Sequence, residues 1–273
     1  MTIEGVWAAV LACGAETPEV AQRLLQAGAR GVVMNGATGE YASASVAQVR
    51  EALQAVGDAP KILGIGGANL ERSLELVKLG EEAGVVALLA PVPFFFPYSI
   101  GDSVAFVEAV SQRTSLPILL YNLPQFTTGY PPQAVAEIRK RCANVVGIKD
   151  SSGSLDLLRE LQRGPGEFCR ILGNDGALVE ARKDDLLHGL ISGVAGVAPE
   201  LILAVWERRE GSASLLQELL DHLSGIPTPW GLKWIAETRG WFVPQFALPL
   251  SESRQQEAVA FRTWCAGWLK KFL

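Results

Sequence analysis

Short apolar segments alternate with longer amphipathic segments along most of this chain, and no other feature constrains the fold as strongly. The short segments do not alternate polar and apolar residues, which is typical of parallel strands that are buried on both faces. Their starts lie roughly 20 to 30 residues apart, enough for a strand, a helix and two loops. We predict strands at residues 6–11, 31–34, 62–65, 85–89, 118–121, 145–148, 169–172 and 189–192.

Helical patterns fill the gaps between these strands. In residues 70–83, for example, Leu74 and Val77 lie opposite Glu71 and Glu75. The other predicted helices are residues 18–27, 45–56, 102–113, 131–142, 155–162 and 175–187. A run of strand–helix units without a long linker predicts an α/β fold of the (β/α)8 TIM-barrel type, and a doubly wound open sheet is the alternative.

The last part of the chain breaks this rhythm. From Pro199 onward only helical patterns occur, at residues 199–209, 213–223, 229–238 and 251–268. Several tryptophans fall in this part, where their bulk favours helix packing. We therefore divide the chain into a barrel core, residues 1–198, and a C-terminal helical extension, residues 199–273, that packs on the barrel and contributes to an oligomer.

Composition excludes several classes of protein. The chain has 273 residues, of which 49% are hydrophobic and 19% charged, with a formal net charge of −5. This balance is typical of a globular protein and argues against nucleic acid or a membrane surface as the partner. No apolar segment is long enough to span a bilayer, and the first residues lack the pattern of a signal peptide. These features predict a cytoplasmic protein.

The cysteines and histidines predict neither disulfides nor a metal site. Cys13, Cys142, Cys169 and Cys265 lie far apart in the sequence, which is typical of reduced thiols, mostly in the core. No group of His, Cys and carboxylate residues has the spacing of metal ligands. We therefore expect a protein without a metal or another cofactor.

Lys149 is the candidate nucleophile. In a TIM barrel the chemistry lies where strands end and the following helices have not begun. Lys149 directly follows the predicted strand 145–148 and has apolar neighbours on it, whereas the other lysines precede a strand or lie on predicted helices. Desolvation favours the neutral amine, which attacks carbonyl groups and forms Schiff bases. The structural alternative is a lysine that is paired with Asp150 or another carboxylate.

Two other strand ends carry candidate binding groups. After the second strand, Gly36 and Gly39 enclose Ala37 and Thr38, and glycines at this spacing let successive N–H groups converge on a carboxylate or phosphate. A plain turn without a ligand is the alternative. Tyr121 ends the fifth strand, where a phenol either relays a proton or caps a backbone carbonyl.

Three motifs together resemble those of a known family. They are residues 36–40, residues 121–124 and residues 147–150, each placed after or at the end of a predicted strand. In this order they are similar to the motifs of the dihydrodipicolinate synthase/N-acetylneuraminate lyase family, whose members are class I Schiff-base aldolases. The similarity covers nearly the whole chain.

The resemblance implies a role for each matching residue. Lys149 would condense with the ketone of pyruvate or another 2-keto acid, the N–H groups of Ala37 and Thr38 would hold its carboxylate, and Tyr121 would relay protons. It also implies a small-molecule substrate and a homo-oligomer, either a dimer or a tetramer built as a dimer of dimers. The remaining substrate-binding candidates are Gly36, Gly39, Phe95, Phe126 and Ile191.

Three residues depart from the pattern of the synthases in this family. Ala37 and Phe95 stand where those synthases carry hydroxyl groups of the proton relay, the second within the segment 94–96 at a subunit contact. Phe126 stands where they carry an arginine that binds a second carboxylate. Burying a carboxylate beside Phe126 without a partner is costly.

Three hypotheses for the function follow. The first is a Schiff-base lyase or aldolase that acts on a pyruvate-derived 2-keto acid through a lysine-bound enamine. The second is the synthase that condenses pyruvate with aspartate semialdehyde. The third is a barrel that binds a keto acid with little or no turnover. Retention of both Lys149 and Tyr121 favours catalysis over mere binding, and Phe126 favours the first hypothesis over the second.

Overall fold

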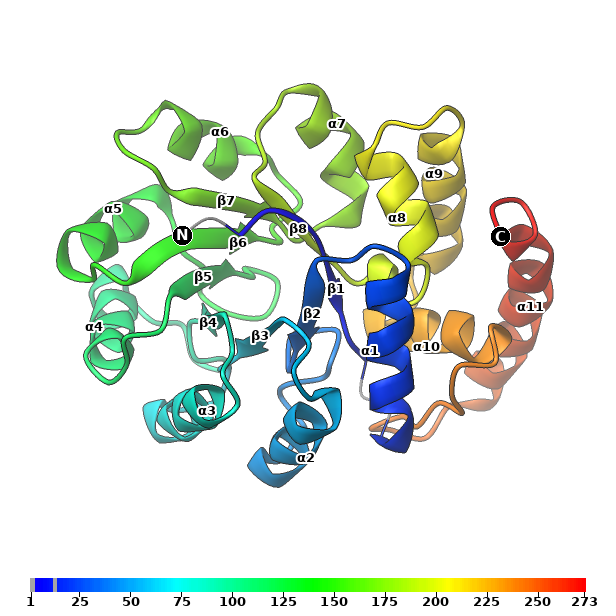
Figure 1. Ribbon diagram of the computed structural model, residues 1–273, viewed down its shortest axis with the longest axis horizontal. Coiled ribbons are helices and arrows are strands. Elements are labelled where there is room, and N and C mark those ends of the chain that lie inside the picture. Colours follow the sequence, from blue (N-terminus) through cyan, green and yellow to red (C-terminus); the bar gives the residue numbers. More distant parts are fainter. Residues whose placement is uncertain (1–2, 12–13) are drawn as a thin grey trace.

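Eight parallel strands form a closed barrel in the order β1 to β8, with helices around it, as Figure 1 shows. The computed structural model describes residues 3–11 and 14–273. The strands are β1 Gly5–Ala9, β2 Gly31–Met34, β3 Lys61–Gly64, β4 Ala87–Pro91, β5 Ile118–Asn122, β6 Val145–Asp150, β7 Cys169–Leu172 and β8 Gly189–Ser192. Pairing of β1 with β8 closes the barrel, which confirms the TIM-barrel prediction and excludes the open sheet.

The helices follow the predicted pattern closely. The first seven are α1 Thr17–Gln26, α2 Val46–Val56, α3 Leu70–Glu82, α4 Ile100–Ser111, α5 Pro132–Arg141, α6 Asp156–Arg163 and α7 Leu178–Lys183. Side-chain caps fix several starts: Ser45 and Gln48 form a capping box at α2, and Ser99 and Asp102 form one at α4.

Helix α7 is shorter than the predicted helix at 175–187. The segment Asp175–Ala177 forms a separate 3-10 turn whose start is capped by the Asn174 side chain. Beyond the helix, Asp185 has a φ of 52°, which ends the helical path, and His188 lies in the loop before β8 rather than on a helix.

The C-terminal helices gather on one side of the barrel, at the right of Figure 1. They are α8 Pro199–Trp206, α9 Ser212–Leu223, α10 Thr228–Thr238 and α11 Glu252–Leu269. Helix α8 packs on β1, α7 and α9, and α10 packs on α11. Trp234 and Trp268 are fully buried there, as expected for tryptophans that serve helix packing. The division of the chain at residues 198 and 199 stays a prediction.

The three described cysteines, Cys142, Cys169 and Cys265, are free and buried, as predicted, and Cys13 lies outside the described residues. Among the described helices, none combines the length and the apolar character that crossing a membrane requires.

Large and small side chains alternate inside the barrel. The Trp7 ring of β1 fills the space beside its register partner Gly31 of β2. A Cβ atom on Gly31 would lie 2.8 Å from Cε3 of Trp7 and still closer to the carbonyl oxygen of Pro60. This interior therefore has no room for an additional methyl group at that level.

We expect Gly31→Ala to lower the free energy of unfolding by about 1–3 kcal/mol, because the added methyl group overlaps Trp7 and the backbone of Pro60. Urea denaturation measures the effect. Gly267→Ala is the matched control: Gly267 is an exposed residue of α11 with nothing within 4 Å of its added Cβ, and this change should stabilise the protein by about 0.5–1 kcal/mol. Equal stability of the two variants would contradict the packing argument.

Candidate active site

One layer of inward-facing residues near the carboxyl ends of the strands carries the candidate chemistry. Parallel register pairs Pro91 with Tyr121, Tyr121 with Lys149, and Lys149 with Ile171. Register partners point to the same face of a sheet, so these side chains lie side by side inside the barrel. The predicted nucleophile and the predicted phenol are therefore neighbours.

Lys149 is buried in this layer, with 4% of its surface exposed. Its Nζ lies 4.1 Å from the centroid of the Tyr121 ring, where the π face stabilises a positive charge. Strand β6 extends through Asp150, two residues beyond the prediction. Asp150 belongs to the opposite face: its Oδ1 accepts hydrogen bonds from Asn122 Nδ2 at 2.9 Å and from the backbone of Ser152 at 3.0 Å.

Gly173, the residue after β7, makes room for the Lys149 side chain. A Cβ atom at Gly173 would lie 2.5 Å from Cε of Lys149 and would collide with Oγ of Ser151. The Ser151 hydroxyl is thus next to the end of the lysine chain, and it is buried without a hydrogen-bond partner among the described residues. Sequence reasoning missed Ser151, although its position two residues after Lys149 gives it the same inward direction.

A buried carboxylate, also missed from the sequence, lies near the same lysine. Asp175 Oδ2 accepts a hydrogen bond from the backbone N–H of Val194 at 3.2 Å, which ties the turn after β7 to the loop after β8. Burial raises the pKa of Asp175, and the positive charge of Lys149 and the hydrogen bonds oppose that rise.

The turn after β2 leaves two backbone N–H groups without a partner in the described chain. Within the described residues, the N–H groups of Ala37 and Thr38 donate no hydrogen bond, so they are free for a ligand. Ala37 packs against the interior cluster that includes Tyr121 and Ile191. Thr38 faces the loop after β8, since its Oγ1 would lie 3.2 Å from a Cβ atom on Gly193.

An ion pair from the C-terminal extension holds this turn in place. Lys233 of α10, only 2% exposed, forms an ion pair with Glu40 and donates a hydrogen bond to the carbonyl oxygen of Gln245 at 2.6 Å. Glu40 has a φ of 57°, a conformation that costs free energy in a residue other than glycine. The buried partner compensates for that cost.

Phe95 and Phe126 lie apart from this layer. Their side chains are 83% and 64% exposed. Within the segment 94–96, Phe94 is the residue that points inward. It packs on the interior cluster and meets the Tyr41 ring edge-on, with centroids 6.0 Å apart. Phe94 also pairs with Thr127 in an antiparallel bridge that joins the loops after β4 and β5.

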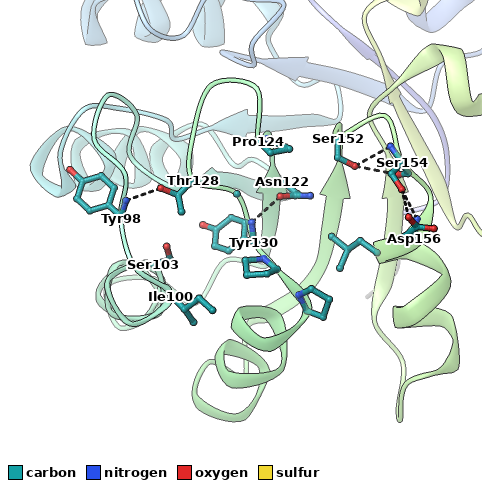
Figure 2. Close-up of a pocket in the computed structure, with 14 residues that line it drawn as sticks. Tyr98, Ile100, Ser103, Asn122, Pro124, Thr128, Tyr130, Ser152, Ser154 and Asp156 are labelled. Atoms are coloured by element: carbon teal, nitrogen blue, oxygen red, sulfur yellow. Dashed lines mark hydrogen bonds between the residues drawn. The ribbon is translucent and has the colours of Figure 1, made fainter.

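A cavity of about 420 Å³ lies beside the loops after β5 and β6, as Figure 2 shows. Its polar side chains are mostly engaged with one another: Thr128 accepts from the backbone of Tyr98 at 2.9 Å, and Asn122 accepts from the backbone of Tyr130 at 2.8 Å. Neither Lys149 nor Tyr121 lines it, so it is separate from the candidate active site.

Comparison with known proteins places the chain in a family. Residues 13–264 match the dihydrodipicolinate synthetase family. A 4-hydroxy-tetrahydrodipicolinate synthase of Methanopyrus kandleri is 32% identical over 262 residues, covering 89% of this chain and 86% of that protein. A second synthase so named, from Aromatoleum aromaticum, is 30% identical over 258 residues, covering 88% of this chain and 87% of that protein.

Solved structures agree in fold. A dihydrodipicolinate synthase of Aquifex aeolicus superposes with a TM-score of 0.86 at 20% identity, covering 98% of each chain. A sialic acid aldolase of Ruminococcus gnavus gives a TM-score of 0.85 at 22% identity, covering 99% of each chain. This chain belongs to the dihydrodipicolinate synthetase family, whose members are class I aldolases and carbon–carbon lyases.

Proposed function

We propose that this protein is a class I aldolase that cleaves a 2-keto acid through a Schiff base on Lys149. The observation that carries the proposal is the buried Lys149 amine over the Tyr121 ring, in a family of Schiff-base enzymes. The turn of Gly36, Ala37, Thr38 and Gly39, with free N–H groups, suits the carboxylate of the keto acid. Ile191 supplies an apolar wall.

The proposed reaction begins with attack of the Lys149 amine on the C2 carbonyl, with loss of water to form an iminium. Tyr121 then takes the proton of the C4 hydroxyl while its own phenol proton passes to water, the C3–C4 bond breaks, and its electron pair enters the iminium to give an enamine and an aldehyde. Tyr121 gives a proton to C3 of the enamine and regains one from water, and addition of water to the resulting iminium releases pyruvate from Lys149. Each phenol and amine ends in its starting state.

The far end of the substrate is expected to be neutral or hydroxylated. Phe126 brings no charge to the rim, whereas the free hydroxyl of Ser151 beside Lys149 suits a hydroxyl group of the substrate. The second candidate function is condensation of pyruvate with aspartate semialdehyde, which the names of the curated relatives favour.

We also propose that two copies of the chain associate through an aromatic patch formed by Phe95, Phe96 and Phe126. Phe96 is 61% exposed and its ring meets that of Phe95 with centroids 4.8 Å apart, and Phe126 precedes Thr127, which pairs with Phe94. Exposed apolar patches are typical of protein interfaces. Phe95 has a φ of 89°, a strained conformation for a phenylalanine that suggests a fixed role for its side chain.

We expect borohydride reduction in the presence of pyruvate to leave a covalent adduct on Lys149, because an imine on this buried amine is reduced to a stable secondary amine. Intact mass and peptide mapping detect it. Lys149→Ala should abolish the adduct. Buried Lys61, at the opposite end of the barrel, is the internal control and should remain unlabelled. Labelling of Lys61 or Lys233 instead would refute the assignment.

We expect this protein to condense pyruvate with aspartate semialdehyde about 10²-fold less efficiently than ordinary synthases, or worse. The reason is that position 126 carries a phenylalanine and no arginine. A coupled assay measures this activity beside the cleavage of 2-keto acids with neutral far ends. Phe126→Arg should raise the condensation, and Phe126→Leu is the matched control. Efficient condensation by the unmodified protein would favour the synthase, and an adduct without any turnover would favour a binding protein.

We expect Phe95→Asp to weaken self-association, because it places a charge in the aromatic patch. Sedimentation velocity compares it with Val243→Asp, a change at an exposed apolar residue outside the patch, 81% exposed. The Phe95 variant should shift towards the monomer while the Val243 variant keeps the assembly. A monomeric unmodified protein would overturn the interface.

A further inference from the structure

A second buried phenol lies in the barrel mouth, close to Tyr121. Tyr41 follows the turn after β2 and is 5% exposed. A Cβ atom on Gly66 would lie 2.5 Å from Cδ2 and Cε2 of Tyr41 and 3.0 Å from Cγ of Pro91. The Tyr41 ring therefore sits beside Pro91, the inward residue that pairs with Tyr121 on the neighbouring strand. Tyr41 and Tyr121 therefore both flank Pro91, and both belong to the same buried cluster inside the barrel.

The electrostatics of Tyr41 agree with this placement. Burial and the neighbouring Tyr121 raise the pKa of Tyr41 to about 12. The phenol is therefore protonated throughout the neutral range and acts as a hydrogen-bond donor there.

The ring of Tyr41 packs against the protein, whereas its hydroxyl has no hydrogen-bond partner in the described part of the chain. The Tyr41 ring meets the Phe94 ring edge-on, with centroids 6.0 Å apart, and packs against the backbone at Gly66, which has no side chain. The Tyr130 hydroxyl, outside the barrel, donates to the carbonyl oxygen of Ala90 at 3.1 Å, whereas the hydroxyls of Tyr41 and Tyr121 form no hydrogen bond with another described residue. A phenol without a protein partner in an apolar mouth is free to bond a reacting group or its neighbour.

We propose that Tyr41 is a second proton-relay group of the active site and supplies the hydroxyl that Ala37 and Phe95 do not. This proposal rests on the proposed function of Lys149. Tyr121 takes a proton from the adduct and gives its own to Tyr41, which releases its own proton to water. When the enamine is protonated at C3, the proton moves in the reverse direction and both phenols return to their starting state.

The test uses pyruvate alone. Enamine formation on Lys149 exchanges the methyl protons of pyruvate for deuterium in D2O, and NMR follows the loss of the methyl signal. Tyr41→Phe keeps the ring and removes only the hydroxyl. We expect it to slow the exchange by about 10- to 10²-fold while the pyruvate concentration for half-maximal borohydride trapping stays unchanged. Because the relay acts as a unit, Tyr41→Phe combined with Tyr121→Phe should be little slower than Tyr121→Phe alone.

Tyr98→Phe is the control, since Tyr98 lines the separate cavity of Figure 2, and its exchange rate should match that of the unmodified protein. Unchanged exchange in Tyr41→Phe, an equal loss in Tyr98→Phe, or multiplicative losses in the double variant would each overturn the relay while leaving Lys149 in place. Absence of any pyruvate adduct in the unmodified protein would overturn the proposed function as well, so the two failures are distinguishable.

Discussion

The limited width of the barrel interior decides where the large side chains of this protein lie. A closed eight-stranded barrel is only wide enough to be filled by its own inward side chains, so a large residue needs a small one beside it. Trp7 takes the space left by Gly31, and Lys149 takes the space left by Gly173. In both pairs a glycine leaves the space that a large neighbour needs. Trp7 fills the barrel interior beside Gly31, and the Lys149 side chain lies beside Gly173.

The same constraint sets the electrostatics of the mouth. The Lys149 amine is held in a buried layer between Tyr121 and Ile171, with the buried carboxyl group of Asp175 nearby. In such a low-dielectric region charges interact strongly, so Lys149 opposes the rise that burial causes in the pKa of Asp175. The hydrogen bond from Val194 fixes that carboxylate and couples the loops after β7 and β8 to the chemistry.

The sequence predicted the barrel well because parallel strands buried on both faces leave continuous apolar runs with no need of long-range information. Lys149 and Tyr121 could be placed in one layer because both end such runs, and the structure makes them register partners. Tyr41 could not be found in this way. Its ring reaches the mouth because Gly66, in the loop after β3, leaves the space, and that proximity depends on three-dimensional closure rather than on sequence spacing. The predicted start of α7 was wrong for a local reason, because Asn174 caps a short 3-10 turn instead of a longer helix.

Backbone strain in the turn after β2 explains why the C-terminal extension contacts that turn. The turn after β2 contains two non-glycine residues in the left-handed region, Asn35 with a φ of 54° and Glu40 with a φ of 57°. Each such residue costs on the order of 1 kcal/mol or more and persists only where surrounding contacts over-determine it. Asn35 is fixed by its hydrogen bond to the carbonyl oxygen of Gly64 at 2.7 Å, and Glu40 by its buried ion pair with Lys233.

The two anchors come from very different parts of the chain. Gly64 belongs to the neighbouring strand, whereas Lys233 lies 193 residues beyond Glu40 on α10. Removing either partner of a buried ion pair leaves an uncompensated charge, so the turn and the helix are stable only together. The turn that carries the free N–H groups of Ala37 and Thr38 is thus held by an ion pair that no local sequence pattern specifies.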